Sequence, residues 1–447
     1  MSISAFFRGS FYSKCYISQR SNFYYCFRYK LTKMDFNPII LSIPIYFALI
    51  GIELLIQAVK RYRIYRLNDA ITNISCGITQ QVTGIFFKVL SVAAYQWVFE
   101  NFALFSIAPT WYNLILLFIL ADFFYYWAHR KSHEINLFWG GHVVHHQSED
   151  YNFSVALRQG SFQIIWTFFF YFPLAILGFD TLSFVLMSGL VTVYQFWIHT
   201  ETIRKMGVFE LIFNTPSHHR VHHGRNPKYI DKNHAGVFII WDKMFGTFQK
   251  EEEKPTYGIT KQTASWNPVW VNLQHYVEMS KGIRQMKGIK NKLKYIFYKP
   301  GWRPKEMGGQ MPIPAVDPEH DQKFDKQASG AFSLYVLVQY IIILGGTALF
   351  LFTADNFNTW EQILAVALII LGVTSLGVVL EEKKYSFALE IFRVLLTPIV
   401  IVFVLLPVIG KAIMIAILAY GLLSFASLIF IKKSYSTVEQ PTSKTIL

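Results

Sequence analysis

The stretch DFFYYWAHRKSHEINLFWGGHVVHH, residues 122–146, decides the character of this chain because it carries two sets of histidines at helical spacing. These sets are His129 and His133, then His142, His145 and His146. Residues three or four apart lie on one face of a helix, so each set makes one histidine face. The intervening pair Gly140 and Gly141 predicts a break in the helix.

A further set repeats the HxxHH spacing later in the chain, at His219, His222 and His223, with His218 just before it. A lone histidine is usually an ordinary core or surface residue, but three sets placed just outside apolar segments favour a metal site. Eight or more imidazoles exceed the ligands of one tetrahedral zinc, so two metals are implied. Imidazole suits iron, zinc, copper and nickel, and ligand type alone does not choose among them. The three cysteines lie away from these sets and predict neither a thiolate site nor a disulfide framework.

The composition is that of a polytopic, all-α membrane protein. Of 447 residues, 53% are hydrophobic and only 16% are charged, whereas a soluble protein has about 25% charged residues. Apolar runs of about 20 residues recur, the length at which a helix crosses a bilayer. The net charge of +14 is concentrated in the connections between these runs, as the positive-inside rule predicts, and requires no nucleic-acid partner.

We expect about nine membrane segments and a cytoplasmic, histidine-rich helical cap. The segments cover approximately residues 38–59, 74–98, 111–128, 161–177, 182–198, 332–352, 360–380, 387–406 and 412–431. The basic cluster that follows the first segment, Lys60 to Arg66, marks the cytoplasmic side. Counting segments from there places all the histidine sets, and His199 at the end of the fifth segment, on that same face.

Four parts are expected along the chain. Residues 1–36 are a basic arm, of which 1–33 are expected to be dispensable, and residues 37–250 form the histidine-bearing membrane domain. Residues 251–329 are a cytoplasmic connection, and 330–447 are a bundle of four membrane segments with a short tail. Basic and apolar residues alternate over 281–296, which fits either a helix lying on anionic lipid or an ordinary solvated face.

Two local features concern the site itself. Thr215 and Pro216 read as an N-cap and a first helical residue, which would place the last histidine set on the first turns of a helix. Asp122 lies within the third apolar segment, on the helix face of His129. An acid there is costly unless it is functional or has a local partner, and both interpretations stay open.

At its histidine sets the chain resembles the fatty acid hydroxylase superfamily of membrane di-iron enzymes, which includes the sterol desaturases. That superfamily carries HxxxH, HxxHH and a further HxxHH set, which match the three sets of this chain. Residues 65–69, 145–152, 197–201, 214–226 and 239–248 look like the branch that oxidises alkylglycerol ether lipids. The similarity extends from about residue 37 to about 400. Where members of that branch often have Asn-Tyr-Gly or Asn-Tyr-Ala, this chain has Asn233-His234-Ala235.

The resemblance implies a membrane enzyme that uses two iron ions, dioxygen and tetrahydrobiopterin to hydroxylate the carbon beside a lipid's ether oxygen. The product would break down to a fatty aldehyde and a glycerol derivative. Glu134 and Asp122 are the expected catalytic residues, and Glu149, Asp150 and Arg158 are candidates for cofactor binding. The expected iron ligands are the eight histidines of the three sets and His199, while the roles of His218 and His234 stay open. The membrane would be the plasma membrane in a bacterium and the endoplasmic reticulum in a eukaryote.

Two alternatives remain at this point. Another enzyme of the superfamily would act on a sterol, a carotenoid or a fatty acid, with a different electron donor. A histidine-rich membrane protein could instead transport metals, but transporters place ligands near mid-membrane and show internal repeats. Here the histidines lie at segment ends, and no repeat is visible.

Overall fold

The regular elements in the described part of the chain are all helices. The computed structural model describes residues 38–61, 63–317, 322–326, 329–405 and 411–438. In these ranges the only β-type pairing is an isolated antiparallel bridge between Phe213 and Phe238. The predicted all-α fold is therefore confirmed. The basic N-terminal arm falls outside the described residues.

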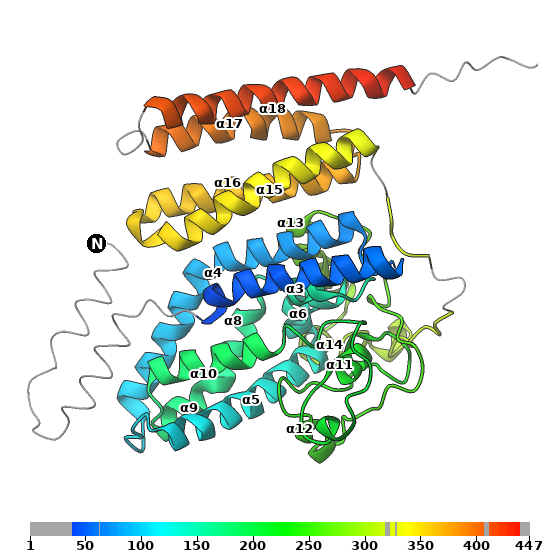
Figure 1. The fold of residues 1–447 in the computed structure, drawn as a ribbon. Coiled ribbons are helices and arrows are strands. Elements are labelled where there is room, and N and C mark those ends of the chain that lie inside the picture. Colours follow the sequence, from blue (N-terminus) through cyan, green and yellow to red (C-terminus); the bar gives the residue numbers. More distant parts are fainter. Residues whose placement is uncertain (1–37, 62, 318–321, 327–328, 406–410, 439–447) are drawn as a thin grey trace, which may run out of the picture. The chain divides into compact units, whose positions relative to one another are not determined.

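The chain divides into two compact units. Among the described residues, the larger contains those from Pro38 to Ala264 together with Trp270–Phe324, and the smaller contains Ser265–Val269 and those from Asp325 to Val438. Seven helices within the described ranges are long and apolar enough to cross a membrane. Three belong to the larger unit, α3 (Pro38–Lys60), α4 (Leu67–Phe102) and α5 (Trp111–Glu134), and four belong to the smaller (Figure 1). The chain is therefore an integral membrane protein.

The fourth and fifth predicted segments are shorter than a membrane span. The fourth is a broken helix made of α8 (Gln163–Thr167), the 3-10 turn η1 (Phe168–Tyr171) and α9 (Phe172–Leu177). Pro173 stands at the start of α9, where its missing N–H costs nothing. The fifth, α10 (Thr181–Tyr194), has 14 residues, whereas a membrane span needs about 20. The nine-span count is therefore not reached by helix length.

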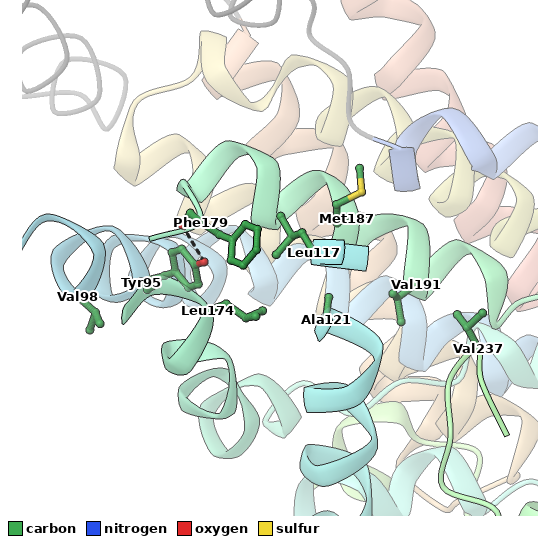
Figure 2. Packing of buried hydrophobic residues seen from close by; sticks show 10 residues of the cluster. Tyr95, Val98, Leu117, Ala121, Leu174, Phe179, Met187, Val191 and Val237 are labelled. Atoms are coloured by element: carbon green, nitrogen blue, oxygen red, sulfur yellow. Dashed lines mark hydrogen bonds between the residues drawn. The ribbon is translucent and has the colours of Figure 1, made fainter. Parts of the chain in front are cut away.

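An apolar core joins these helices. Tyr95 and Val98 of α4 belong to one buried cluster with Leu117 and Ala121 of α5 and with side chains from α9, α10 and the segment after Gly236 (Figure 2). The Tyr95 hydroxyl donates to the backbone oxygen of Phe179 at 3.1 Å, which satisfies its polar end within the core. This core fixes α5 against α10, so the ends of both helices are held close together.

The helix break of the histidine stretch lies at Ile135, not at the glycine pair. Ile135 is extended, with φ −118° and ψ 118°, and separates α5 from α6 (Asn136–His146). Gly140 and Gly141 are inside α6, where they permit close packing. A Cβ on Gly141 would come within 2.8 Å of the Gln163 Cα, and one on Gly160 would overlap the Gly141 carbonyl oxygen. The glycines bring α8 against the histidine helix.

Short elements complete the larger unit. They are α7 (Phe153–Ala156), η2 (Gly207–Leu211), α11 (Pro216–His223), α12 (Ile240–Met244) and η3 (Lys305–Met307). The basic region predicted as one helix is in fact two, α13 (Pro268–Gln285) and α14 (Ile289–Phe297). Gly288 divides them with a φ of 76°, a left-handed conformation that ends the first helix.

The smaller unit is a bundle of four helices with a buried ion pair inside it. The helices are α15 (Gly330–Thr353), α16 (Thr359–Leu380), α17 (Ser386–Leu405) and α18 (Lys411–Val438), with the short turn η4 (Ala354–Asn356). Arg393 donates to Glu390 from both Nε and Nη2. Tyr335 and Ser375 also donate to that carboxylate, so α15, α16 and α17 share one polar centre.

Candidate metal centre

Nine buried histidines gather into two clusters. In each cluster the possible ligand atoms all lie within 4.8 Å of one another. The five-histidine cluster contains His129, His133, His142, His146 and His222. The four-histidine cluster contains His145, His199, His219 and His223. These are the nine histidines that the sequence suggested as ligands.

Each HxxHH set divides between the two clusters. On α6, His142 and His146 are one turn apart and join the five-histidine cluster, whereas His145 faces the other cluster. On α11 the assignment is reversed, because His222 joins the five-histidine cluster. An HxxHH set therefore serves two sites at once, since its i, i+4 pair and its remaining member lie on different sides of the helix.

The local sequence explains how α11 reaches this position. Thr215 is its N-cap residue and Pro216 its first residue, as predicted, although the Thr215 side chain makes no capping bond. Arg220, between the histidines, forms a two-point ion pair with Glu251 at 2.8 and 2.7 Å. It also donates to the carbonyl of Thr200, next to His199. Arg220 thus joins α11 to the segment after α10 that carries His199 of the four-histidine cluster, a role that the sequence analysis missed.

In five of the clustered histidines, the ring nitrogen Nδ1 is hydrogen-bonded to a carbonyl or amide oxygen. The Nδ1–oxygen pairs are His129 with the His234 carbonyl at 2.7 Å, His145 with the Arg158 carbonyl at 2.9 Å, His199 with the Gln195 carbonyl at 2.7 Å, His222 with the Lys232 carbonyl at 2.9 Å, and His142 with the Gln163 amide oxygen at 3.3 Å. Because a carbonyl oxygen only accepts, Nδ1 must carry the proton in these rings. Their Nε2 lone pairs are therefore left to face the cluster, as in metal-bound histidines.

The inward-facing nitrogens approach one another closely. Nε2 of His199 lies 3.2 Å from that of His145 and 3.0 Å from that of His219. In the other cluster, Nε2 of His142 is 2.9 Å from that of His129. In the His145–His199 and His129–His142 pairs both Nδ1 atoms carry the proton, so each pair has two lone pairs in contact and no proton between them. A shared cation removes this repulsion, so the donor set fits metal ions.

The alternative, a proton between the rings, is opposed by burial. Burial lowers the pKa of His145 to about 4 and holds the pKa values of His199, His219 and His222 well below their usual range, with neighbouring imidazoles lowering them further. These rings are therefore neutral at physiological pH, which is the form that binds metals.

The predicted catalytic carboxylates lie outside both clusters. Asp122 is fully buried and accepts three bonds, from the backbone N–H of Val237 at 2.7 Å, that of Phe238 at 2.9 Å and the Trp241 indole at 2.9 Å. It thereby ties α5 to the segment whose His234 carbonyl supports His129. Glu134 forms ion pairs with its helix neighbours Arg130 and Lys131. In this arrangement neither acid belongs to either cluster.

The candidate cofactor residues are bonded within the protein. Asp150 accepts from Arg66 at 2.9 Å and Lys323 at 2.7 Å, and the carboxylate of Glu149 accepts from the Phe324 N–H. The Arg158 guanidinium is buried and donates to the Val144 carbonyl, Asn73 and Gln147. Since the Arg158 carbonyl accepts from His145, this residue links α4 and α6 to the four-histidine cluster.

Two further histidines are buried but belong to neither cluster. His234 is 1% exposed and neither ring nitrogen has a hydrogen-bond partner, while its ring centre lies 4.9 Å from that of His133. The His218 ring lies against Phe248. His275 is partly buried, and its Nε2 lies 2.9 Å from the Asn136 carbonyl oxygen at the start of α6.

Glu53 and Asp242 are two buried acids near the centre that the sequence analysis missed. Glu53, on α3, accepts from the Phe153 N–H and from the hydroxyls of Tyr65 and Thr200. Asp242 accepts from the backbone N–H groups of His234 and Ala235. An acid within the first apolar segment was the signal for Glu53, by the same argument that singled out Asp122.

Comparison with known proteins identifies the family. The family model for fatty acid hydroxylases matches residues 114–247, a range that contains all nine clustered histidines. An alkylglycerol monooxygenase from Homo sapiens is 39% identical over 360 residues, covering 79% of this chain and 80% of its own length. The chain belongs to the alkylglycerol monooxygenase family. The sequence resemblance is thereby confirmed, and this member of the family is a membrane monooxygenase.

Other alkylglycerol monooxygenases agree. The protein from Xenopus tropicalis is 37% identical over 78% of this chain and 79% of its own, and that from Caenorhabditis elegans is 32% identical over 74% and 69%. A more distant match is an ornithine lipid hydroxylase from Rhizobium tropici, 29% identical over 35% of this chain and 48% of its own. No solved structure matches. Membership of an oxygenase family leaves the metal-transporter hypothesis without support.

Proposed function

We propose that this alkylglycerol monooxygenase family member hydroxylates alkylglycerol lipids at the carbon next to the ether oxygen, using two iron ions, dioxygen and a reduced pterin. One observation carries the proposal: two separate clusters of buried, neutral imidazoles with converging lone pairs, in a chain related over most of its length to alkylglycerol monooxygenases. Two clusters imply two metals, and the relatives' activity suggests the lipid.

The nine clustered histidines would hold the irons, one ion in each cluster. Bound there, iron would supply the activation of dioxygen that neutral imidazoles cannot perform. The residues around the clusters keep the rings in place. Backbone carbonyls fix the ring orientation through Nδ1, and burial of all nine rings excludes water. Zinc binds nitrogen sites more tightly than ferrous iron does, so iron selectivity would depend on metal supply.

The two predicted catalytic acids would act by positioning. Asp122 would hold the segment that supports His129, and Glu134 would fix Arg130, whose guanidinium also donates to Tyr126. Contact of Glu149, Asp150 and Arg158 with the pterin stays a prediction. The internal bonds of Arg158 favour a role in placing α6 over one in holding a free ligand.

The substrate's chemistry explains the site of attack. A hydrogen on the carbon next to an ether oxygen is easier to remove than one further along the chain, because the oxygen stabilises the radical left behind. One oxygen atom of dioxygen would enter this C–H bond, and the other would leave as water with two electrons and two protons from the reduced pterin. The hydroxylated carbon would be a hemiacetal, which breaks its C–O bond to give a fatty aldehyde and glycerol.

We further propose that the histidine clusters face the cytoplasm. The basic residues that follow α3 support this orientation through the positive-inside rule. The membrane would then be the plasma membrane in a bacterium or the endoplasmic reticulum in a eukaryote.

A labelled substrate tests the reaction. The iron-loaded protein, with reduced tetrahydrobiopterin, would be given an alkylglycerol with two deuterium atoms on the carbon next to the ether oxygen. We expect a fatty aldehyde that retains one deuterium, and no aldehyde from an ester lipid of equal length. A hydroxylated lipid with its ether bond intact and both deuterium atoms retained would contradict the proposal. A panel of sterols, carotenoids and fatty acids would then identify the substrate of the alternative hydroxylase.

A further inference from the structure

The outer face of α14 has an unusual composition for a surface helix. Ile289, Leu293 and Phe297 are 71%, 49% and 53% exposed. They are four residues apart, so they form one stripe along the helix. On an ordinary surface helix this outward face is polar and the apolar stripe is turned to the core. Here the apolar stripe points away from the larger unit, so it needs a partner.

Charge identifies the kind of partner. Residues 281–305 contain nine lysines or arginines and no acidic residue. Such a surface attracts anionic phosphates, and two copies of it would repel each other, which argues against pairing of two chains through α14. An apolar stripe flanked by lysines is the pattern of helices that lie in the headgroup layer of anionic membranes.

The segment after α14 continues the same pattern. Tyr298 is half exposed, and the Lys294 ammonium lies 5.5 Å from its ring centre and 5.9 Å from that of Trp302. Tyrosine and tryptophan are the side chains most enriched at membrane–water interfaces. A cation stacked on two such rings places charge and aromatic surface at the same depth.

Helix α14 and the residue after it are also hydrogen-bonded to α6, one of the helices that carry the clustered histidines. The Asn136 N–H donates to the Tyr298 carbonyl at 2.9 Å, and its side-chain amide donates to the Tyr295 carbonyl at 3.0 Å. Asn136 is the first residue of α6 and lies between His133 and His142. A displacement of α14 is therefore transmitted to the junction of α5 and α6, which supply four of the five histidines of the five-histidine cluster.

We propose that α14 docks on the headgroup layer of an anionic phospholipid membrane through Ile289, Leu293 and Phe297, with the surrounding lysines bound to lipid phosphates. Docking there sets the position of α6 relative to the membrane from which a lipid substrate comes. This inference is independent of the metal and of the substrate, so it stands or fails separately from the proposed function.

Spin labels in the full-length protein test the docking. Single cysteines at 289, 293 and 297, and at the exposed Lys261 as a control, would be labelled in nanodiscs of phosphatidylcholine with or without phosphatidylglycerol. We expect the α14 labels to be accessible to oxygen and protected from a water-soluble nickel chelate when anionic lipid is present, and the control to show the reverse. The proposal would be overturned if the labels on α14 remained accessible to the nickel chelate in nanodiscs both with and without phosphatidylglycerol. Protection from both reagents would mean contact with protein and would also overturn it.

Charge variants provide a second readout. Replacing Lys287, Lys290 and Lys292 by glutamine should raise the fraction of anionic lipid needed to protect the label at 297, since each lysine contributes about fivefold to affinity for such a surface. The matched control replaces three exposed lysines elsewhere in the larger unit, Lys250, Lys254 and Lys261, and should leave that fraction unchanged. Equal shifts in both variants would show that only net charge matters, and would overturn a specific role for α14.

Discussion

At the level of single residues, the histidine pattern carried most of the information about the site. All nine histidines chosen as ligands from spacing and segment position lie in the two clusters, because helical periodicity alone brings residues four apart together. The division of each HxxHH set between clusters could not be predicted, since it depends on where α6 and α11 meet. Long-range partners such as Arg220 with Glu251 were missed for the same reason.

Replacing one clustered histidine tests the ligand assignment. We expect His145→Ala to lower the affinity for metal by at least about tenfold, the lower range seen when only a supporting residue of a metal ligand is lost. The His145 ring faces the four-histidine cluster, so that site should empty first. Metal per folded chain would be measured by mass spectrometry of the purified protein.

His218→Gln is the matched control for that variant. His218 lies on the same helix as His219 but belongs to neither cluster, so the metal content should not change. Full metal retention in His145→Ala, or equal loss in both variants, would show that the clusters are not the binding sites.

At the level of helices, the sequence predicted which segments are helical better than it predicted where each helix begins and ends. The apolar runs predicted α3, α15, α16 and α17 to within two residues at each end, because runs of this length have no stable alternative in a membrane. Helices α5 and α18 continue six and seven residues past the predicted ends, 128 and 431. The break in the histidine stretch was misplaced. By local helix propensity alone, a pair of glycines predicts a helix break. Here the glycines remain within α6 and allow its close tertiary contact with α8, which local propensity does not describe.

A substitution at that contact should disturb the centre from a distance. In Gly160→Ala the new methyl group would overlap the backbone oxygen of Gly141, and backbone on both sides leaves little room to relax. We expect a loss of about 1–3 kcal/mol in stability, typical of overpacking, together with weaker metal binding, since α6 must move.

Gly51→Ala, on α3, is the control, because nothing lies within 4 Å of the added methyl group. Both variants would be compared by thermal unfolding and by metal content. A Gly160→Ala protein with unchanged midpoint and unchanged metal would show that α6 and α8 are free to separate.

At the level of the whole molecule, the two units contain different kinds of buried polar group. The larger holds the histidine clusters, and the smaller holds the Glu390–Arg393 pair, at 0% and 2% exposure. The sequence analysis expected a bundle of four membrane segments here and did not single out the pair. Acid and base three residues apart on a helix are common on surfaces, and only the packing of α15 to α17 around them makes them a centre.

Breaking this pair should weaken the smaller unit alone. Glu390→Gln leaves the Arg393 charge buried without its counter-ion, which typically costs about 3–5 kcal/mol. The double variant Glu390→Gln with Arg393→Met should recover part of that loss, because no unpaired charge remains. Protease resistance of the C-terminal bundle would report stability.

Metal content serves as the internal control in the same samples. No clustered histidine belongs to the smaller unit, so metal per chain should stay constant in both variants. A fall in metal that parallels the protease sensitivity would mean that the bundle is needed to hold the clusters together.

The length of α4 has a consequence for how a lipid must travel. Its 36 residues make a rod of about 54 Å, whereas the hydrocarbon layer is about 30 Å thick. The first turns of α4 are polar and bonded inward, with Asn73 reaching Ser154 and Arg158, so the surplus length belongs at this end. We therefore expect the histidine clusters to lie outside the hydrocarbon layer, so that a lipid would have to leave this layer in part to be oxidised. Transfer of each methylene group from the bilayer into water would cost about 0.8 kcal/mol. Lipids with one chain should therefore reach the histidine clusters more readily than lipids with two chains.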